Sequence, residues 1–149
     1  MALFVAGNTQ GTTLATQDVW AKVEFDGSLS DGAPLVERFS MCGDGSLAEF
    51  VYQGREQLTG AINVQMRCRA DSGGASLDDF EVGWGLNDAD PVNVAPYSIP
   101  ELNANLVKDF IFNQAFRVVE GDKLSLFVRC TTDARDFIIE NVAIFAQEI

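Results

Sequence analysis

Ala61-Ile-Asn-Val-Gln-Met-Arg-Cys-Arg69 alternates apolar and polar side chains without a break. An extended chain would carry the apolar members on one side, namely Ile62, Val64, Met66 and Cys68. A side-chain period of two is typical of a β-strand with one buried face, whereas a helix would scatter these four residues around its circumference. Other strands must therefore cover this apolar face.

Two further stretches show the same alternation. Residues 80–86 place apolar side chains at every second position, and two of the positions between them are Gly83 and Gly85. Glycine on one face of a strand often marks the close approach of another backbone. Residues 123–131 alternate in the same way, with Cys130 on the apolar face. These stretches predict two more half-buried strands.

The rest of the chain predicts shorter strands separated by turns. Residues 87–100 contain three prolines and predict an irregular connection or a broken edge strand, and residues 102–106 predict one helical turn. A hairpin turn is expected at 120–122. Further strands are expected at residues 11–16, 19–25, 34–41, 47–52, 107–119 and 137–149. Eight to ten short strands without an amphipathic helix predict an all-β antiparallel sandwich or barrel.

Length and charge narrow the function classes. The 149 residues are 47% hydrophobic, which suits one domain spanning residues 1–149. A net charge of −12 disfavours binding to nucleic acid or to an anionic membrane. The start of the chain is apolar but short and uncharged, so we do not expect a signal peptide. No run reaches the ~20 apolar residues that span a bilayer.

Few residues suggest catalysis or cofactor binding. Histidine is absent, and no phosphate-binding or dinucleotide motif is present. Acidic residues that could pair for glycoside hydrolysis are Asp78, Asp79, Glu81, Asp88 and Asp90. The Asn87–Asp90 segment offers oxygen ligands for calcium, but an Asx-rich turn explains it better. We expect no enzyme, no cofactor and no metal site. The three cysteines are expected to be buried free thiols of a chain made in a reducing cytoplasm, and they are Cys42, Cys68 and Cys130.

The last strands carry apolar residues on both faces, which a two-layer sandwich does not require. Either a third layer or a neighbouring subunit must cover the second face. The candidate subunit-interface residues are Ile111, Ala115, Val119, Ala143 and Phe145. Arg67 and Arg69, on the polar face of the opening stretch, are either solvated or paired with acidic residues across a subunit boundary.

Several short motifs occur in an order found in one known family. They are Asn8-x-x-Gly-Thr-Thr13, Trp20-Ala-Lys-Val23, Arg38-Phe-Ser40 before Gly43-Asp-Gly45, Phe50-Val-Tyr-Gln-Gly54, Val82-Gly-Trp-Gly-Leu-Asn87, Val118-Val-Glu-Gly-Asp-Lys-Leu-Ser-Leu126 and Ile138-Ile-Glu-Asn141. Together they resemble the tumour-necrosis-factor-like jelly rolls of tailed-phage virion proteins. The resemblance implies a two-sheet jelly roll of ten strands and a homotrimer about a threefold axis.

We expect no stalk, membrane anchor or fibre shaft attached to the predicted head. A free-standing trimer of this kind is similar to a capsid decoration (cement) protein, which binds the major capsid protein on the outside of the virion and stabilises the shell. Threefold symmetry and multivalent contacts suit this role. The apolar segment containing Leu3, Phe4 and Val5 is a candidate arm for contact with the capsid, or else an ordinary edge strand within residues 1–10.

Two alternatives remain open. One is a receptor- or glycan-binding head of a phage tail fibre or vertex spike, which would need an exposed aromatic platform from Trp84, Tyr97 and Tyr52. The other is a cellular carbohydrate-binding module, which we would expect to be monomeric.

Overall fold

The computed structural model describes residues 2–7, 11–25, 30–31, 38–42, 46–71, 76–91 and 96–148, the first and third of these by their backbone only. Within these ranges every regular element is a β-strand, and no helix is long and apolar enough to cross a membrane. The strands are β1 (Ala2–Gly7), β2 (Ala21–Lys22), β3 (Ser30–Asp31), β4 (Phe39–Met41), β5 (Glu49–Tyr52), β6 (Leu58–Ala70), β7 (Asp78–Leu86), β8 (Tyr97–Leu102), β9 (Lys108–Val118), β10 (Lys123–Cys130) and β11 (Phe137–Glu148).

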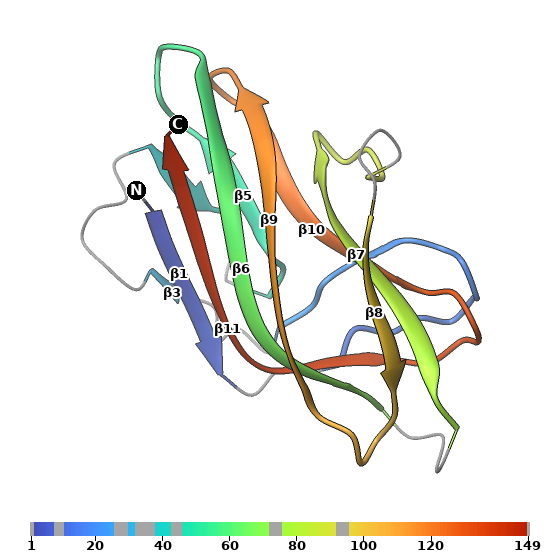
Figure 1. Cartoon of the computed structure of the whole chain (residues 1–149). Coiled ribbons are helices and arrows are strands. Elements are labelled where there is room, and N and C mark those ends of the chain that lie inside the picture. The colour runs from blue at the N-terminus through green and yellow to red at the C-terminus, as the bar shows by residue number, and fades with distance from the viewer. Residues whose placement is uncertain are drawn as a thin grey trace.

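The strands form two antiparallel sheets that face each other (Figure 1). Sheet A has the order β3-β1-β11-β6-β9, and sheet B has the order β4-β5-β10-β7-β8, with β2 also paired to β10. Without the short strands β2, β3 and β4, eight strands remain. Renumbered from one to eight along the chain, they have the order 1-8-3-6 in sheet A and 2-7-4-5 in sheet B. This is the double Greek-key order of a jelly roll. The predicted all-β, antiparallel two-sheet jelly-roll fold is confirmed.

The apolar face of the opening stretch is the core face of sheet A. Val64 and Cys68 on β6 are fully buried, as are Val82 on β7 and Leu126 on β10. The polar residues between them point away from the opposite sheet, as the period of two requires. The predicted strands at residues 61–69, 80–86 and 123–131 are therefore confirmed, although β6 is longer than predicted at both ends.

Three local predictions are wrong. Residues 11–16 form no strand and contribute one bridge, between Thr12 and Phe137. Leu102 ends β8, and residues 103–106 form a turn closed by an Asn103–Leu106 bridge, without a helical turn. The tight turn at 120–122 is present, with Gly121 at φ 88°, but it joins β9 of sheet A to β10 of sheet B and so makes no hairpin.

One buried side chain bridges the two sheets at their open side. In the described ranges β8 pairs with β7 only as far as Val82, so no described strand pairs with Trp84 on the side away from β10. The Gln114 amide on β9 takes that place: its Oε1 accepts from the Trp84 N–H at 3.1 Å, and its Nε2 donates to the Trp84 carbonyl at 3.3 Å. A side chain thus replaces a strand in satisfying two buried backbone groups.

Replacing Gln114 by alanine should destabilise the fold markedly. Both backbone groups of Trp84 would lose their partner in a buried place, where an unsatisfied group costs about 1–3 kcal/mol. We expect the free energy of urea unfolding to fall by about 2–3 kcal/mol. The matched control is Asn113→Ala at the neighbouring exposed position, which should change it by about 0.5 kcal/mol or less. Equal losses in the two variants would contradict the bridging role.

Candidate functional site

The chain itself covers part of the outer face of sheet B, the side turned away from sheet A. After β7 the backbone reverses at Asn87 and Asp88, whose φ angles are 51° and 66°. We call residues 87–91 the flap. The Asn87 side chain holds its start, because Nδ2 donates to Asp122 Oδ1 at 2.8 Å and Oδ1 accepts from the Lys123 N–H at 2.9 Å. The Asx-rich turn expected here is therefore present.

Two glycines allow the flap to lie against β7. A Cβ added to Gly85 would meet the Ala89 carbonyl oxygen at 2.0 Å, and one added to Gly83 would meet the Pro91 Cβ at 3.0 Å. The ring of Phe127, an outward residue of β10, lies 2.7 Å from the same Gly85 position and is only 4% exposed. The close backbone approach predicted from the glycines is confirmed, and its effect is to bury Phe127.

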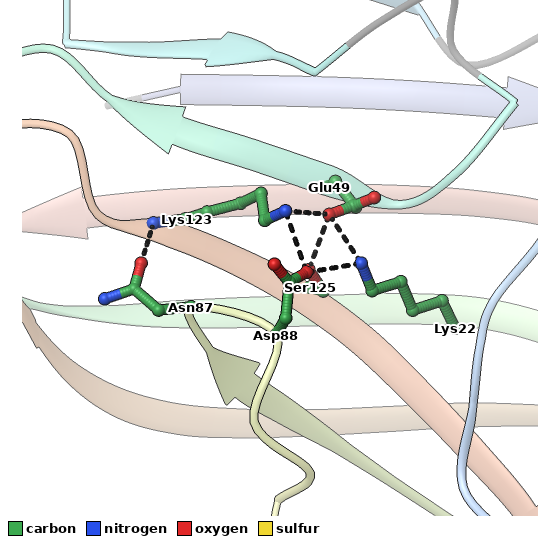
Figure 2. A network of polar contacts seen from close by, with 6 residues as sticks. All are labelled: Lys22, Glu49, Asn87, Asp88, Lys123 and Ser125. Atoms are coloured by element: carbon green, nitrogen blue, oxygen red, sulfur yellow. Dashed lines mark hydrogen bonds and ion pairs between the residues drawn. The ribbon is translucent and has the colours of Figure 1, made fainter.

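A cluster of four charged groups fastens the flap to sheet B (Figure 2). Lys22 on β2 and Lys123 on β10 each reach Glu49 on β5, with Nζ–Oε2 distances of 3.1 and 3.2 Å. The same two amines contact Asp88 Oδ1 on the flap at 2.5 and 2.8 Å. The buried Ser125 hydroxyl donates to Glu49 Oε2 at 3.0 Å. We call this cluster the ion-pair clamp.

The clamp keeps its four groups charged. Hydrogen bonds from Lys123 and Lys22 lower the pKa of Asp88 to about 2. Burial alone would raise the pKa of Glu49, but hydrogen bonds from the lysines and Ser125 outweigh it and lower that pKa. Burial also opposes the charge of Lys22, yet its hydrogen bonds to Asp88 and Glu49 raise its pKa, and the bond to Asp88 raises that of Lys123.

The clamp is therefore suited to holding a segment in place and not to proton transfer. An amine nucleophile must lose its proton, and a general acid must hold one near neutral pH, whereas every shift here runs the other way. Glu49 is the critical member because its side chain is only 8% exposed. A buried carboxylate that loses its cations is costly, whereas the exposed pairs of Asp88 are individually weak.

Replacing Asp88 by asparagine should lower the free energy of unfolding at pH 7 and leave it nearly unchanged at pH 2. The carboxylate has a lowered pKa in the folded state, so its stabilisation is complete above the ordinary value of 3.8 and disappears as the pH falls through about 2. Urea unfolding of both proteins at pH 7, 4 and 2 measures the difference. The control is Asp90→Asn, on the same flap but outside the clamp, and a difference that does not vary with pH would contradict the assignment.

Replacing Gly85 by alanine should displace the flap. Its new Cβ would overlap a backbone oxygen, which cannot rotate away, so we expect a loss of about 1–3 kcal/mol in unfolding free energy. Gly83→Ala is the matched comparison, because it meets only the proline ring at 3.0 Å and should cost less. Guanidinium unfolding monitored by tryptophan fluorescence measures both, and an equal or reversed ranking would disprove this contact.

The outer face of sheet A carries most of the predicted interface residues. Ile111 on β9 is 63% exposed, and Ala143 and Phe145 on β11 are half-buried. Ile111 and Ala143 are both paired in register with Gln65 on the strand between them. They line a shallow groove of about 350 Å³ whose other members are Gln65, Met66, Asp109, Phe110, Asn141 and Val142.

Two other predicted interface residues lie further along β9. Ala115 is exposed and pairs in register with Ala61, so it shares this face. Val119 is 50% exposed but follows the end of β9, eight residues or about 27 Å from Ile111. The structure thus places Ile111, Ala115, Ala143 and Phe145 on one face, with Val119 at its far end.

The two arginines of this sheet have partners within the chain. Arg67 Nε lies 3.0 Å from Asp109 Oδ1, and Arg69 Nε lies 3.2 Å from Glu140 Oε1. The hydrogen bond between Arg67 and Asp109 lowers the pKa of Asp109 and raises that of Arg67. The alternative that these arginines pair across a subunit boundary lacks support, because each carboxylate partner lies on a neighbouring strand of the same sheet.

The N-terminal segment is not a free arm. Ala2–Gly7 is β1, which pairs along its whole length with β11 and, at Phe4 and Val5, with β3. Residue 1 and residues 8–10 lie outside the described ranges. The backbone of Leu3 is opposite Phe145 and that of Val5 is opposite Ala143, so β1 extends the sheet that carries the exposed groove. Contact of Leu3, Phe4 and Val5 with a capsid stays a prediction.

The predicted aromatic platform does not form. Trp84 and Tyr52 are 3% and 1% exposed. Tyr97 is half-buried with its ring 4.8 Å from that of Phe112, and its hydroxyl donates to the Asn113 carbonyl. Trp84 and Tyr52 lie on the core faces of their strands, as the alternation over residues 80–86 already indicated for Trp84.

The acidic candidates serve as structural acceptors. Asp78 accepts from the Thr132 hydroxyl at 2.9 Å, the Glu101 N–H donates to Asp79, and Arg129 donates to Glu81 at 2.7 Å. In the described ranges, no three histidine, cysteine, aspartate or glutamate side chains are placed to hold a metal ion.

The cysteines follow the prediction in part. Cys68 and Cys130 are free and fully buried, and burial raises the pKa of the Cys68 thiol to about 12. Cys42 is free but only half-buried, so it was wrongly expected in the core. Burial is also the main cause that raises its pKa.

Comparison with known proteins adds little beyond the fold. No family model matches the chain, and no curated protein matches it. Among solved structures it is similar to rabbit GITRL, with 11% identity over 99% of this chain and 94% of that one and a TM-score of 0.48. Murine APRIL has 6% identity over 95% and 97% of the two chains, with a TM-score of 0.48. A CBM35 from Cellvibrio japonicus Abf62 has 12% identity over 99% and 97%, with a TM-score of 0.41.

The sequence alone did not predict the ion-pair clamp. Lys22 and Glu49 are 27 positions apart, on strands too short to show a period. The available signal was Gly83 and Gly85, which predicted that a segment lies over β7 without showing which segment or what holds it.

Proposed function

We propose that this chain is a structural, non-enzymatic module that assembles as a homotrimer through the outer face of sheet A. The observation that supports this proposal is that outward apolar side chains are buried on sheet B but exposed on sheet A. On sheet B the outward Phe127 is 4% exposed beneath the flap, whereas on sheet A the outward Ile111 is 63% exposed. A second copy of the chain would cover this face.

The energetics suit an oligomer. Complete burial of a large aliphatic or aromatic side chain is worth about 1.5–3 kcal/mol, and Ile111 and the half-buried Phe145 would each contribute part of that in every copy. In a threefold ring each interface joins two different surfaces, so the groove beside Ile111 would receive another part of its neighbour. The ion pairs of Arg67 and Arg69 are complete within the subunit and would not oppose docking.

We further propose that the trimer decorates the outer surface of a viral capsid and stabilises it by binding the major capsid protein. The resemblance to virion jelly rolls supports this role, and the net charge of −12 suits a shell exterior better than contact with the genome. Three identical contacts at a threefold position would add through multivalency. Buried free Cys68 and Cys130 are compatible with synthesis in a reducing host cytoplasm.

The alternative of a receptor- or glycan-binding head loses its main support. It relied on exposed aromatic rings at Trp84, Tyr97 and Tyr52, two of which are core residues. The exposed apolar groups of sheet A are aliphatic or half-buried, which suits protein contact better than stacking on sugar rings.

Replacing Ile111 by aspartate should weaken the trimer. A charge in the centre of the proposed interface would lose the burial energy and add a desolvation cost, so we expect the trimer–monomer midpoint concentration to rise at least tenfold. Light scattering coupled to size exclusion over a dilution series measures it. The control is Val19→Asp, which is also more than half exposed, at 53%, but lies outside sheet A. A wild-type monomer at all concentrations, or equal effects of the two variants, would contradict the assembly.

The capsid role has a separate test. Quantitative mass spectrometry of purified virus particles should find this chain in many copies, in multiples of three per icosahedral facet. The purified chain should also rebind to particles from which it has been stripped, and raise their temperature of genome release. A few copies per particle would favour a tail or vertex head, and absence from particles would end the virion proposal while leaving the trimer intact.

A further inference from the structure

A second cavity lies between the sheets at their open side. It has a volume of about 250 Å³ between the last part of β7 and the edge strand β9, and the flap forms one wall. Its floor contains Trp84, Phe116 and Leu124, which are 3%, 9% and 4% exposed. Sites for drug-sized ligands usually measure about 300–1,000 Å³, so this cavity suits a single apolar side chain.

Beside this cavity, β9 presents unpaired backbone. β9 is the last strand of sheet A, and the Asn113 carbonyl accepts from the Tyr97 hydroxyl on β8, so it points away from β6. In an antiparallel strand alternate residues share the same hydrogen-bonding direction. The N–H and C=O groups of Ala115 and Arg117 therefore also point to the free edge, and no described residue bonds to them. Such an edge is a template for another strand.

A free cation lies at the same place. Arg117 is exposed and lines the cavity. All seven arginines lie in the described ranges, and five have a described carboxylate within ion-pair distance, namely Arg38, Arg67, Arg69, Arg129 and Arg135. Arg117 and Arg55 have none among the described carboxylates. In a chain with 22 acidic residues, an unpaired arginine beside an unpaired strand edge indicates an acidic partner group.

We propose that the β9 edge binds an extended peptide segment of a partner protein by β-augmentation, through Ala115 and Arg117. One large apolar side chain of the peptide enters the cavity above Trp84, and an acidic side chain next to it in sequence pairs with Arg117. This order follows from strand geometry. Successive side chains of an added strand point to opposite faces, so the neighbour of the cavity residue lies on the outer face of sheet A, where Arg117 points.

This inference does not rest on the trimer or on the capsid role, because it uses the edge of β9 and the cavity between the sheets. Ala115 is the one residue that it shares with the proposed trimer face, so the oligomeric state of each Ala115 variant is measured beside its peptide binding. The partner needs an extended segment with adjacent apolar and acidic residues. Main-chain hydrogen bonds would supply affinity, and the cavity would supply selectivity for the apolar residue.

The test is selection of a random ten-residue peptide library on the full chain, in parallel with two variants. Ala115→Pro removes the N–H that points to the free edge of β9 and leaves the hydrogen bonds between β9 and β6 intact. Edge strands tolerate proline at such a position. Ala115→Ser keeps the N–H. We expect peptides with an apolar residue next to an acidic one to be enriched on wild type and Ala115→Ser. Enrichment on Ala115→Pro should be at least tenfold weaker.

An enriched peptide then checks the cavity directly. Its affinity by calorimetry should fall at least tenfold when its apolar residue becomes glycine, and also with Leu86→Glu, which puts a charge at the 40%-exposed wall residue. Urea midpoints confirm that each variant folds. No enrichment on wild type over Ala115→Pro, or glycine peptides that bind as well, would overturn the proposal.

Discussion

The structure depends on the burial of one face of each sheet against the other. Strands with a period of two have one apolar face, and two such sheets satisfy each other only when their apolar faces meet. Fully buried residues from both sheets, such as Val64 and Leu126, form that shared core. The alternation therefore also decides which side chains are left on the two outer faces, and these are where function must be sought.

The two outer faces are treated differently. Sheet B has glycines on β7, a flap that lies over them and an ion-pair clamp that holds the flap, so Phe127 is buried by the chain itself. Sheet A has a groove beside an isoleucine that is 63% exposed. The same chain thus hides one outward aromatic residue with its own loop and leaves one outward aliphatic residue for another molecule. The proposed trimer follows from this contrast.

The open side between the sheets is the third distinctive region. The Gln114 amide completes the hydrogen bonds of Trp84 where the described pairing of β7 with β8 stops, and just beyond it β9 has backbone groups that no described residue bonds, next to a small cavity. On this side of the sandwich, the Gln114 side chain bonds the edge of β7 at Trp84, whereas the edge of β9 at Ala115 and Arg117 has no described partner. The flap contributes a wall of this cavity, so the clamp on the outer face also fixes the shape of the proposed peptide site.

The sequence by itself determined the strands with clear alternation, the antiparallel sandwich-or-barrel class and the close approach over Gly83 and Gly85, because a period of two and the lack of a Cβ are local properties. The jelly-roll order was an expectation from the family resemblance. The sequence also separated Ile111 from its buried neighbours. Only the tertiary structure decided that Tyr52 faces the core, that Arg67 and Arg69 are paired within the subunit, and that residues 2–7 are a paired strand. The ion-pair clamp and the free edge of β9 were also decided only by the tertiary structure. Each depends on which strands become neighbours, and strand order is set by long-range contacts that no local pattern encodes.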